Sequence, residues 1–172
     1  MHYHSYLKHI SATAQKQLTL EPANFDINEN THQVFNESAN ILIKRIAGDV
    51  LYLDPPYTDR NYGSSYHLLN TLARYDNFVP SGKTGLREYQ KSAWCRKRLV
   101  ASELDDLMMQ VQFQYIFLSY NNEGLLSPQN IENIMSRYGR YDYVSTDYRR
   151  FKSCSGIHQA NKTTEYIHIL EK

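Results

Sequence analysis

The residues most suited to chemistry in this sequence are the tetrapeptide Asp54-Pro55-Pro56-Tyr57. They form a stiff turn that is rich in hydrogen-bond acceptors. The Asp54 carboxylate and the Pro55 carbonyl can only accept hydrogen bonds, and neither proline carries an N–H group. The prolines also restrict the backbone, because each fixes its own φ and limits the residue before it. Tyr57 adds a flat apolar ring on which another ring can stack. Together these groups suit a nucleobase that bears an exocyclic NH2 group.

The chemistry that this corner offers is the activation of an amine. The amine nitrogen of a nucleobase is a poor nucleophile, because its lone pair is conjugated into the ring. Hydrogen bonds from the NH2 group to Asp54 and to the Pro55 carbonyl would favour the pyramidal form, whose lone pair can attack. The alternative is a Pro-Pro turn that only ends a strand and buries a ring. The apolar run over residues 50–53, directly before the turn, favours the chemical interpretation.

The surrounding sequence predicts the strands that must position this corner. Residues 50–53 are expected to form a buried strand, and ligands of α/β proteins bind beyond the carboxyl ends of such strands. Further strands are expected at 34–35, 115–118, 141–148 and 164–170.

Helices are expected between these strands. Apolar periodicity predicts a helix over 39–47, which Gly48 ends, and another over 98–110. A third begins at Ser127-Pro128, with Ile131, Ile134 and Met135 on its apolar face, and is closed by Gly139. The order of elements predicts an α/β fold with a mostly parallel sheet, a C-terminal antiparallel hairpin and a long insertion after the corner.

Composition limits the class of protein. The 172 residues are 41% hydrophobic and 22% charged, which fits one globular domain, and the net charge of +1 excludes a histone-like protein. No apolar run approaches the ~20 residues of a membrane span. The polar start, with His2 and His4, is neither a signal peptide nor a metal site, because a third ligand is missing. Cys95 and Cys154 predict no disulfide scaffold, which favours a reducing, cytoplasmic setting.

The residues around the corner resemble one family of enzymes. The segment Leu51–Tyr57 resembles the catalytic motif of amino-methyltransferases, specifically the D12 class of adenine-N6 DNA methyltransferases. Further stretches similar to that family are 36–40, 66–70, 82–87, 118–124, 148–152 and 164–166, so the resemblance covers about residues 34–170. The combination is highly specific, whereas Asp-Pro-Pro-Tyr alone is moderately so.

This resemblance implies a partial Rossmann-like sheet and transfer of a methyl group from S-adenosyl-L-methionine (AdoMet) to N6 of adenine in double-stranded DNA. The adenine would be flipped out of the duplex, in the setting of a restriction–modification system. By the same resemblance Asp54 and Pro55 orient the amine, Tyr57 stacks on the adenine and Pro56 stiffens the corner. Asp in the first position of the motif is the usual form in adenine enzymes. Direct transfer needs no metal and no covalent enzyme intermediate.

The resemblance also points to residues on the cofactor side. The family often places an acidic residue near the cofactor adenine, after the short strand that precedes the first helix. The candidates are Asn36, Glu37 and Ser38, together with Asp54. The best register puts Ser38 where Asp is usual, so either Glu37 substitutes or the contact is weakened. The alternative is that Asn36 and Ser38 only cap the following helix.

Two segments rich in cations predict contacts to DNA phosphates. Residues 87–98 hold five cations and one anion, and residues 137–152 hold five cations and two anions. A protein of nearly neutral charge can bind phosphates through such segments, and the alternative is two ordinary solvated faces. The candidate DNA contacts are Tyr66, Lys83, Arg87, Lys97, Arg149, Arg150 and Lys152.

Two further groups of residues are open to two interpretations each. Asn121 and Asn122 follow a predicted strand, and they either line the same rim as Asp54 or form an ordinary turn. Aromatic residues between 62 and 94 either stack near an extruded base or belong to the core; they are Tyr62, Tyr66, Tyr75, Phe78, Tyr89 and Trp94.

The glycines indicate that part of such an enzyme is missing. None of the seven forms the Phe-x-Gly-x-Gly loop with which the family cradles the methionine part of AdoMet. We therefore expect residues 34–172 to be the C-terminal catalytic portion of a larger enzyme, with 58–97 as a DNA-facing insertion. Residues 1–33 would be an N-terminal extension at the end of an upstream DNA-recognition region. Such a portion should expose apolar surface and could require an N-terminal complementing segment.

Two other functions remain open from sequence alone. The chain could be a non-catalytic DNA-binding fragment that has kept the basic and aromatic insertion. It could also belong to a methyltransferase that acts on adenine in RNA.

Overall fold

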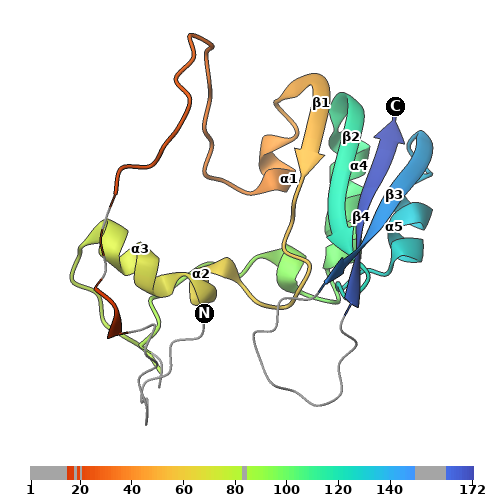
Figure 1. Ribbon diagram of the computed structural model, residues 1–172. Helices are drawn as coiled ribbons and strands as arrows, with labels where there is room; N and C mark the ends of the chain where they lie inside the picture. The colour runs from red at the N-terminus through yellow and green to blue at the C-terminus, as the bar shows by residue number, and fades with distance from the viewer. Residues whose placement is uncertain (1–14, 18, 20, 83–84, 150–161) are drawn as a thin grey trace.

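The computed structural model describes residues 15–17, 19, 21–82, 85–149 and 162–172 of the chain (Figure 1). Four strands form one sheet in the order β1-β2-β4-β3. The strands are β1 (Ala47–Leu53), β2 (Gln112–Asn121), β3 (Arg140–Arg149) and β4 (Lys162–Glu171). The helices are α1 (Ala39–Leu42), α2 (Tyr62–Ser65), α3 (His67–Arg74), the 3-10 turn η2 (Ala93–Cys95), α4 (Val100–Gln110) and α5 (Pro128–Met135).

The sheet is mixed, and the prediction of a mostly parallel sheet is wrong. β1 and β2 are parallel, with Leu53 opposite Leu118. β4 lies between β2 and β3 and runs antiparallel to both. The predicted C-terminal hairpin is confirmed, because β3 pairs with β4 from Arg140–Glu171 to Arg149–Lys162. The α/β class therefore holds, but parallel pairing is limited to one of the three strand pairs.

The first predicted helix is also wrong in extent. α1 has only four residues, and the chain is already in β1 at Ala47, because Ala47 pairs with Gln112. Gly48 consequently lies inside β1 and ends no helix. An added Cβ there would lie 2.9 Å from Cε1 of Phe113, so glycine allows this ring to approach the strand. The predicted short strand at 34–35 is not formed either.

The last helix agrees with its sequence signals. The Ser127 side chain accepts a hydrogen bond from the Asn130 backbone N–H, which forms a capping box, and Pro128 occupies the first helical position. Ile131, Ile134 and Met135 are all buried. The helix ends at Met135, before the predicted stop at Gly139.

The hydrophobic core lies on one face of the sheet. In the second half of β2, alternate residues are fully buried on this face, namely Ile116, Leu118 and Tyr120. Figure 1 shows α4 and α5 packed side by side behind the strands. Their buried residues complete the core, and each large aliphatic side chain contributes about 1.5–3 kcal/mol through burial.

The opposite face of the sheet is apolar and open among the described residues. Val50, Tyr52 and Val144 point to this face and are 58%, 61% and 57% exposed. The strand at 50–53 was predicted to be buried, and this part of the prediction is wrong. The outer edge of β1 also has no neighbouring strand in the described part of the chain. The expected exposed apolar surface is therefore present. No described helix is long and apolar enough to cross a membrane.

Residues 58–97 leave the lower end of β1 and run out beside the sheet (Figure 1). A buried amide, Asn40 of α1, fastens the end of this insertion to the core. Its Oδ1 accepts a hydrogen bond from Trp94 Nε1 at 3.0 Å. Its Nδ2 donates to the Glu103 carbonyl and to Asp106 Oδ2, both at 2.9 Å. One side chain thus joins α1, η2 and α4.

We expect Asn40→Ala to lower the free energy of unfolding by about 2 kcal/mol, because a buried donor left without a partner is costly. Urea denaturation, followed by the fluorescence of the single tryptophan, measures this change. The exposed Asn70 supplies the control Asn70→Ala. Equal unfolding midpoints for the two variants would contradict the role given to Asn40.

Candidate active site

The 54–57 corner follows β1 directly, at the carboxyl end of the parallel pair of strands. Its backbone is held by the turn after β2, because the Tyr57 carbonyl accepts a hydrogen bond from the Leu125 N–H at 2.9 Å. The Tyr57 ring meets the Tyr120 ring edge to face, with centroids 6.0 Å apart and an interplanar angle of 74°. Asp54 is exposed, while Pro55, Pro56 and Tyr57 are half-buried.

Two clefts lie on either side of this corner. The first, of about 720 Å³, is lined by residues of the corner and of the insertion, including Pro56, Tyr57, Arg60, Tyr62 and Tyr66. The second, of about 570 Å³, is lined among others by Asn36, Glu37, Ser38, Asp54, Pro55 and Trp94. Pro56 lines both clefts, so the corner forms the partition between them.

Two aromatic rings of the first cleft, Tyr57 and Tyr62, carry phenols whose pKa is raised. Burial raises the pKa of Tyr57, and the nearby carboxylates of Glu165 and Asp54 raise it further. Burial likewise raises the pKa of Tyr62, with Asp54 and Tyr57 adding to the effect. Both rings are thus uncharged at neutral pH and present apolar faces with a polar tip.

The predicted cofactor residues come together in the second cleft. Asn36, Glu37 and Ser38 share it with Asp54. Glu37 forms an ion pair with Arg45. Ser38 occupies the N-cap position of α1, but its side chain makes no capping hydrogen bond. The alternative that Ser38 only caps the helix therefore receives no support from the geometry.

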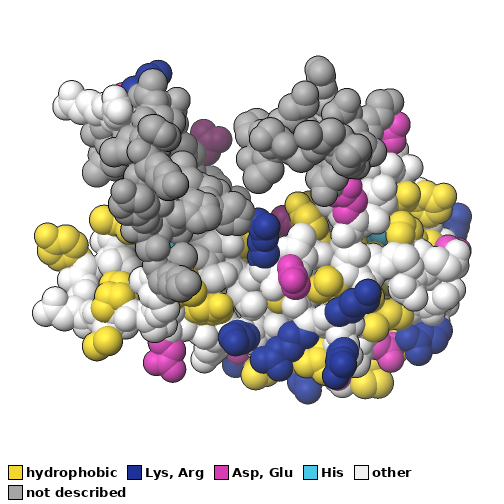
Figure 2. Space-filling view, turned by 90° about the horizontal axis from the view of Figure 1, so that it is seen from below, with side chains coloured by type: hydrophobic (Ala, Val, Ile, Leu, Met, Phe, Trp, Pro, Cys, Tyr) yellow, Lys and Arg dark blue, Asp and Glu magenta, His cyan; other side chains and the backbone are white. Residues whose placement is uncertain are grey.

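The predicted DNA contacts fall in several places. Tyr66 is half exposed beside the first cleft, with its ring 5.8 Å from that of Tyr62. Lys97 is exposed between η2 and α4. Arg149 ends β3, whereas Lys83, Arg150 and Lys152 lie outside the described residues. Figure 2 shows Lys and Arg side chains gathered toward the lower right of one face, with Asp and Glu among them.

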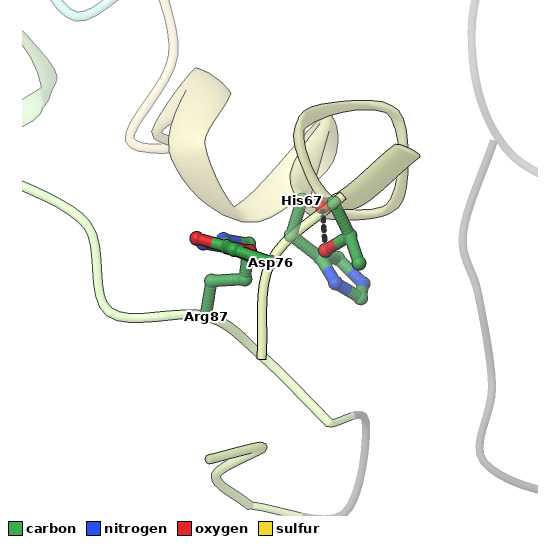
Figure 3. Close-up of polar contacts among 4 residues, drawn as sticks. His67, Asp76 and Arg87 are labelled. Atoms are coloured by element: carbon green, nitrogen blue, oxygen red, sulfur yellow. Dashed lines mark hydrogen bonds and ion pairs between the residues drawn. The ribbon is translucent and has the colours of Figure 1, made fainter. Parts of the chain in front are cut away.

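Arg87 is the predicted DNA contact that the structure places in the interior, with 8% of its surface exposed. Its guanidinium binds both carboxylate oxygens of Asp76 at 2.7 Å and lies 4.3 Å from the centre of the Phe78 ring. Figure 3 shows this pair beside α3, near His67. Because these partners occupy the fork and the plane of the guanidinium, Arg87 organises the insertion and is not available to phosphate.

Asn121 and Asn122 form a turn. The Asn121 side chain accepts a hydrogen bond from the Glu123 N–H at 3.1 Å. The Asn122 side chain accepts from the Thr163 hydroxyl at 2.9 Å and from the Thr164 N–H at 3.1 Å. These bonds tie the end of β2 to the start of β4, and they favour the turn interpretation of both residues.

Sequence reasoning missed several residues that build the site. Trp94 is 8% exposed and belongs to the core, which is one of the two interpretations left open for it, and it also lines the second cleft. Its partner Asn40 was missed, because the residues that Asn40 contacts lie far away in the sequence. Tyr120 could have been found by extending the predicted strand at 115–118, because residues two apart in a strand share a face and Tyr120 follows Leu118 by two. Among the described residues, no group of three or more His, Cys, Asp or Glu side chains could hold a metal ion.

Comparison with known proteins identifies the family. A family model described as D12 class N6 adenine-specific DNA methyltransferase matches residues 1–137. The chain belongs to this family.

The curated relatives that this chain matches are longer than the chain. Over 173 residues the chain is 54% identical to the type II methyltransferase M.NlaIII of Neisseria lactamica, covering 99% of the chain and 52% of that relative. It is 39% identical to M.FokI of Planomicrobium okeanokoites, covering 99% of the chain and 27% of the relative. It is 36% identical to M.CviAII of Paramecium bursaria Chlorella virus 1, covering 96% of the chain and 49% of the relative. The chain thus spans about half or less of these relatives. No solved structure matches it.

The Asp76–Arg87 pair should make the insertion sensitive to acid. Arg87 holds the pKa of Asp76 below its ordinary value of 3.8, so the pair stabilises the fold above that pH and loses its effect as the pH falls through the lowered value. Amide exchange of residues 67–78, corrected for intrinsic rates, should therefore rise on acidification in the native chain and much less in Asp76→Asn. Asp142→Asn, on exposed β3, is the control, and identical acid responses for Asp76→Asn and the native chain would refute the assignment.

Proposed function

We propose that this chain is the catalytic portion of a site-specific DNA methyltransferase of a restriction–modification system. It would act in the cytoplasm and transfer the methyl group of AdoMet to N6 of an adenine flipped out of double-stranded DNA. The observation that carries the proposal is the 54–57 corner, which forms the partition between an aromatic cleft and a polar cleft. Family membership supports the same reaction, and the names of the relatives support the biological setting.

The first cleft suits the target base. Tyr57 offers a ring face for stacking, and Tyr62 and Tyr66 bring two further rings to the same cleft. An adenine placed there would have its amine near Asp54 and the Pro55 carbonyl, which are acceptors only. They would accept hydrogen bonds from the two N6 hydrogens and so hold the nitrogen lone pair toward the second cleft. Once the nitrogen has taken the methyl group, one of these protons would leave, to the Asp54 carboxylate or to water. Pro56 would keep this geometry stiff.

The second cleft suits the methyl donor. Its described residues supply carboxylate, amide and hydroxyl groups from 36–38, beside apolar surface from Tyr52, Leu53 and Trp94, which fits the polar and flat parts of an adenosine. When bound, AdoMet supplies a methyl group on a positively charged sulfur. Glu37 is the acidic residue of the 36–38 segment and is the one that we assign to the adenosine.

We also propose that polypeptide from outside these 172 residues completes the second cleft and the sheet. The open apolar face, the unpaired edge of β1 and the greater length of the relatives support this. A strand added beside β1 and a glycine-rich loop would extend the four strands to a Rossmann-like sheet. Parallel sheets are usually covered on both faces, whereas the described residues cover β1 and β2 on one face.

Replacing Asp54 should abolish methyl transfer. We expect Asp54→Ala to lower the rate by at least about 100-fold in the complete enzyme, because an oriented electrostatic contact to the reacting group is lost. Transfer of labelled methyl groups to duplex DNA measures the rate, and circular dichroism reports the fold. Asp49→Ala, at an exposed position in β1 five residues before the corner, is the matched control. Normal activity of Asp54→Ala would rule out the proposed role.

The same assay separates the alternatives. Methylation of single-stranded RNA in preference to duplex DNA would favour an RNA enzyme. Salt-sensitive DNA binding, without AdoMet binding by the complete protein, would favour a non-catalytic DNA-binding module.

The basic segment at 96–98 should contact phosphate. Each phosphate contact that is lost should reduce the slope of log K against log salt by about 0.9. We expect this change in Lys97→Ala, measured by fluorescence anisotropy with duplex DNA between low and moderate salt. Lys44, exposed before the amino end of β1 and away from the corner, supplies the control Lys44→Ala. An unchanged slope in Lys97→Ala would remove Lys97 from the interface.

A further inference from the structure

We infer that Tyr120 and Gly124 act together as positioning residues for Tyr57. They touch neither the base nor the methyl donor, and they fix where the Tyr57 ring stands at the first cleft. The inference rests on the proposed methyl transfer for its effect on rate, and on geometry alone for its effect on structure.

The corner does not hold Tyr57 by its own hydrogen bonds. Pro55 and Pro56 have no N–H groups to donate, so the backbone at Tyr57 depends on partners elsewhere in the chain. The partner in the structure is the Leu125 N–H, which donates to the Tyr57 carbonyl at 2.9 Å. The position of the 121–126 turn therefore sets the position of the Tyr57 backbone.

The ring of Tyr57 is also held by β2, the strand that precedes the 121–126 turn. Tyr120 is 1% exposed and shares its face of β2 with Leu118, so it is fixed by the core. Its ring meets Tyr57 edge to face, an arrangement that aromatic pairs favour. The Tyr57 ring still lines the first cleft, so one side of it is braced while another remains accessible.

Two contacts hold the 121–126 turn against Tyr120. The Tyr120 hydroxyl accepts a hydrogen bond from the Leu126 N–H at 3.4 Å. Gly124 lies so close to the ring that an added Cβ would be 2.2 Å from Cε1 and 2.9 Å from Cζ of Tyr120. Only glycine therefore lets the turn pass close enough for the next residue, Leu125, to reach the Tyr57 carbonyl.

Gly124→Ala tests this arrangement, because the added methyl must displace either the turn or the Tyr120 ring. In the complete enzyme we expect kcat to fall about 10- to 100-fold, as misplacement by about 1 Å can do. The KM values for DNA and AdoMet should stay within about 2-fold, since binding outside the reacting centre is kept. An unchanged kcat would overturn the inference.

Gly48→Ala is the matched control. It also presses a methyl group on an aromatic ring of β2, at 2.9 Å from Phe113 Cε1, but at the opposite end of β1 from the corner. It should lower the unfolding midpoint and leave kcat unchanged. An equal loss of kcat in both variants would indicate general destabilisation and overturn the positioning role.

Two substitutions of Tyr120 test whether its ring causes the loss of kcat expected in Gly124→Ala. Tyr120→Phe keeps the ring, so Gly124→Ala should remain harmful in that background. Tyr120→Leu removes Cε1 and Cζ, so adding Gly124→Ala to it should cost no further activity. If kcat in the double variant fell by the product of the two single losses, the two residues would act separately, which would contradict the inference.

A measurement without turnover keeps this inference distinct from the proposed function. Amide exchange of Leu125 should be faster in Gly124→Ala and unchanged in Gly48→Ala. Absence of methyl transfer by the native enzyme would refute the proposed function alone. Unchanged Leu125 exchange in Gly124→Ala would refute the positioning role, whatever reaction the enzyme performs.

Discussion

Leu53 lies opposite Leu118 in the parallel pair of β1 and β2, and this register decides what the 54–57 corner meets. A shift by one residue would turn the alternating side chains of β1 to the other face. With the observed register, the chain leaves β1 beside Tyr120 and the turn that follows it. The backbone and ring contacts of Tyr57, and hence one wall of the first cleft, follow from this one pairing.

Buried polar side chains fix the insertion, which lies away from the sheet. Asn40 joins Trp94 to α4 and so builds one wall of the second cleft. Arg87 and Asp76, 11 residues apart, join two segments of the insertion beside α3. Buried polar groups of this kind stabilise one arrangement over others only while all partners are present. The insertion is thus organised by specific hydrogen bonds, whereas α4, α5 and β2 are organised mainly by apolar burial.

Sequence patterns predicted those parts whose causes are local. The cap at Ser127, the apolar face of α5 and the strands at 141–148 and 164–170 each follow from neighbouring residues, and the structure has them. The extent of α1 and the direction of the sheet could not be predicted, because pairing at Ala47 and the insertion of β4 between β2 and β3 are long-range events. Arg87 looked like a phosphate ligand for a different reason, because no sequence pattern shows that its guanidinium turns back onto Asp76, 11 residues earlier.

The position of Pro56 has a consequence for how such a protein could evolve or be redesigned. One residue borders both clefts, so a change there alters both binding sites at once. Tyr62 and Tyr66 border only the first cleft and come from the separate insertion. Under the proposed function, variation in the accepted base can therefore accumulate on α2 and its flanks without disturbing the other cleft. The 54–57 corner, which both clefts share, is therefore costly to alter. The outer wall of the first cleft, with Tyr62 and Tyr66, is free to diversify.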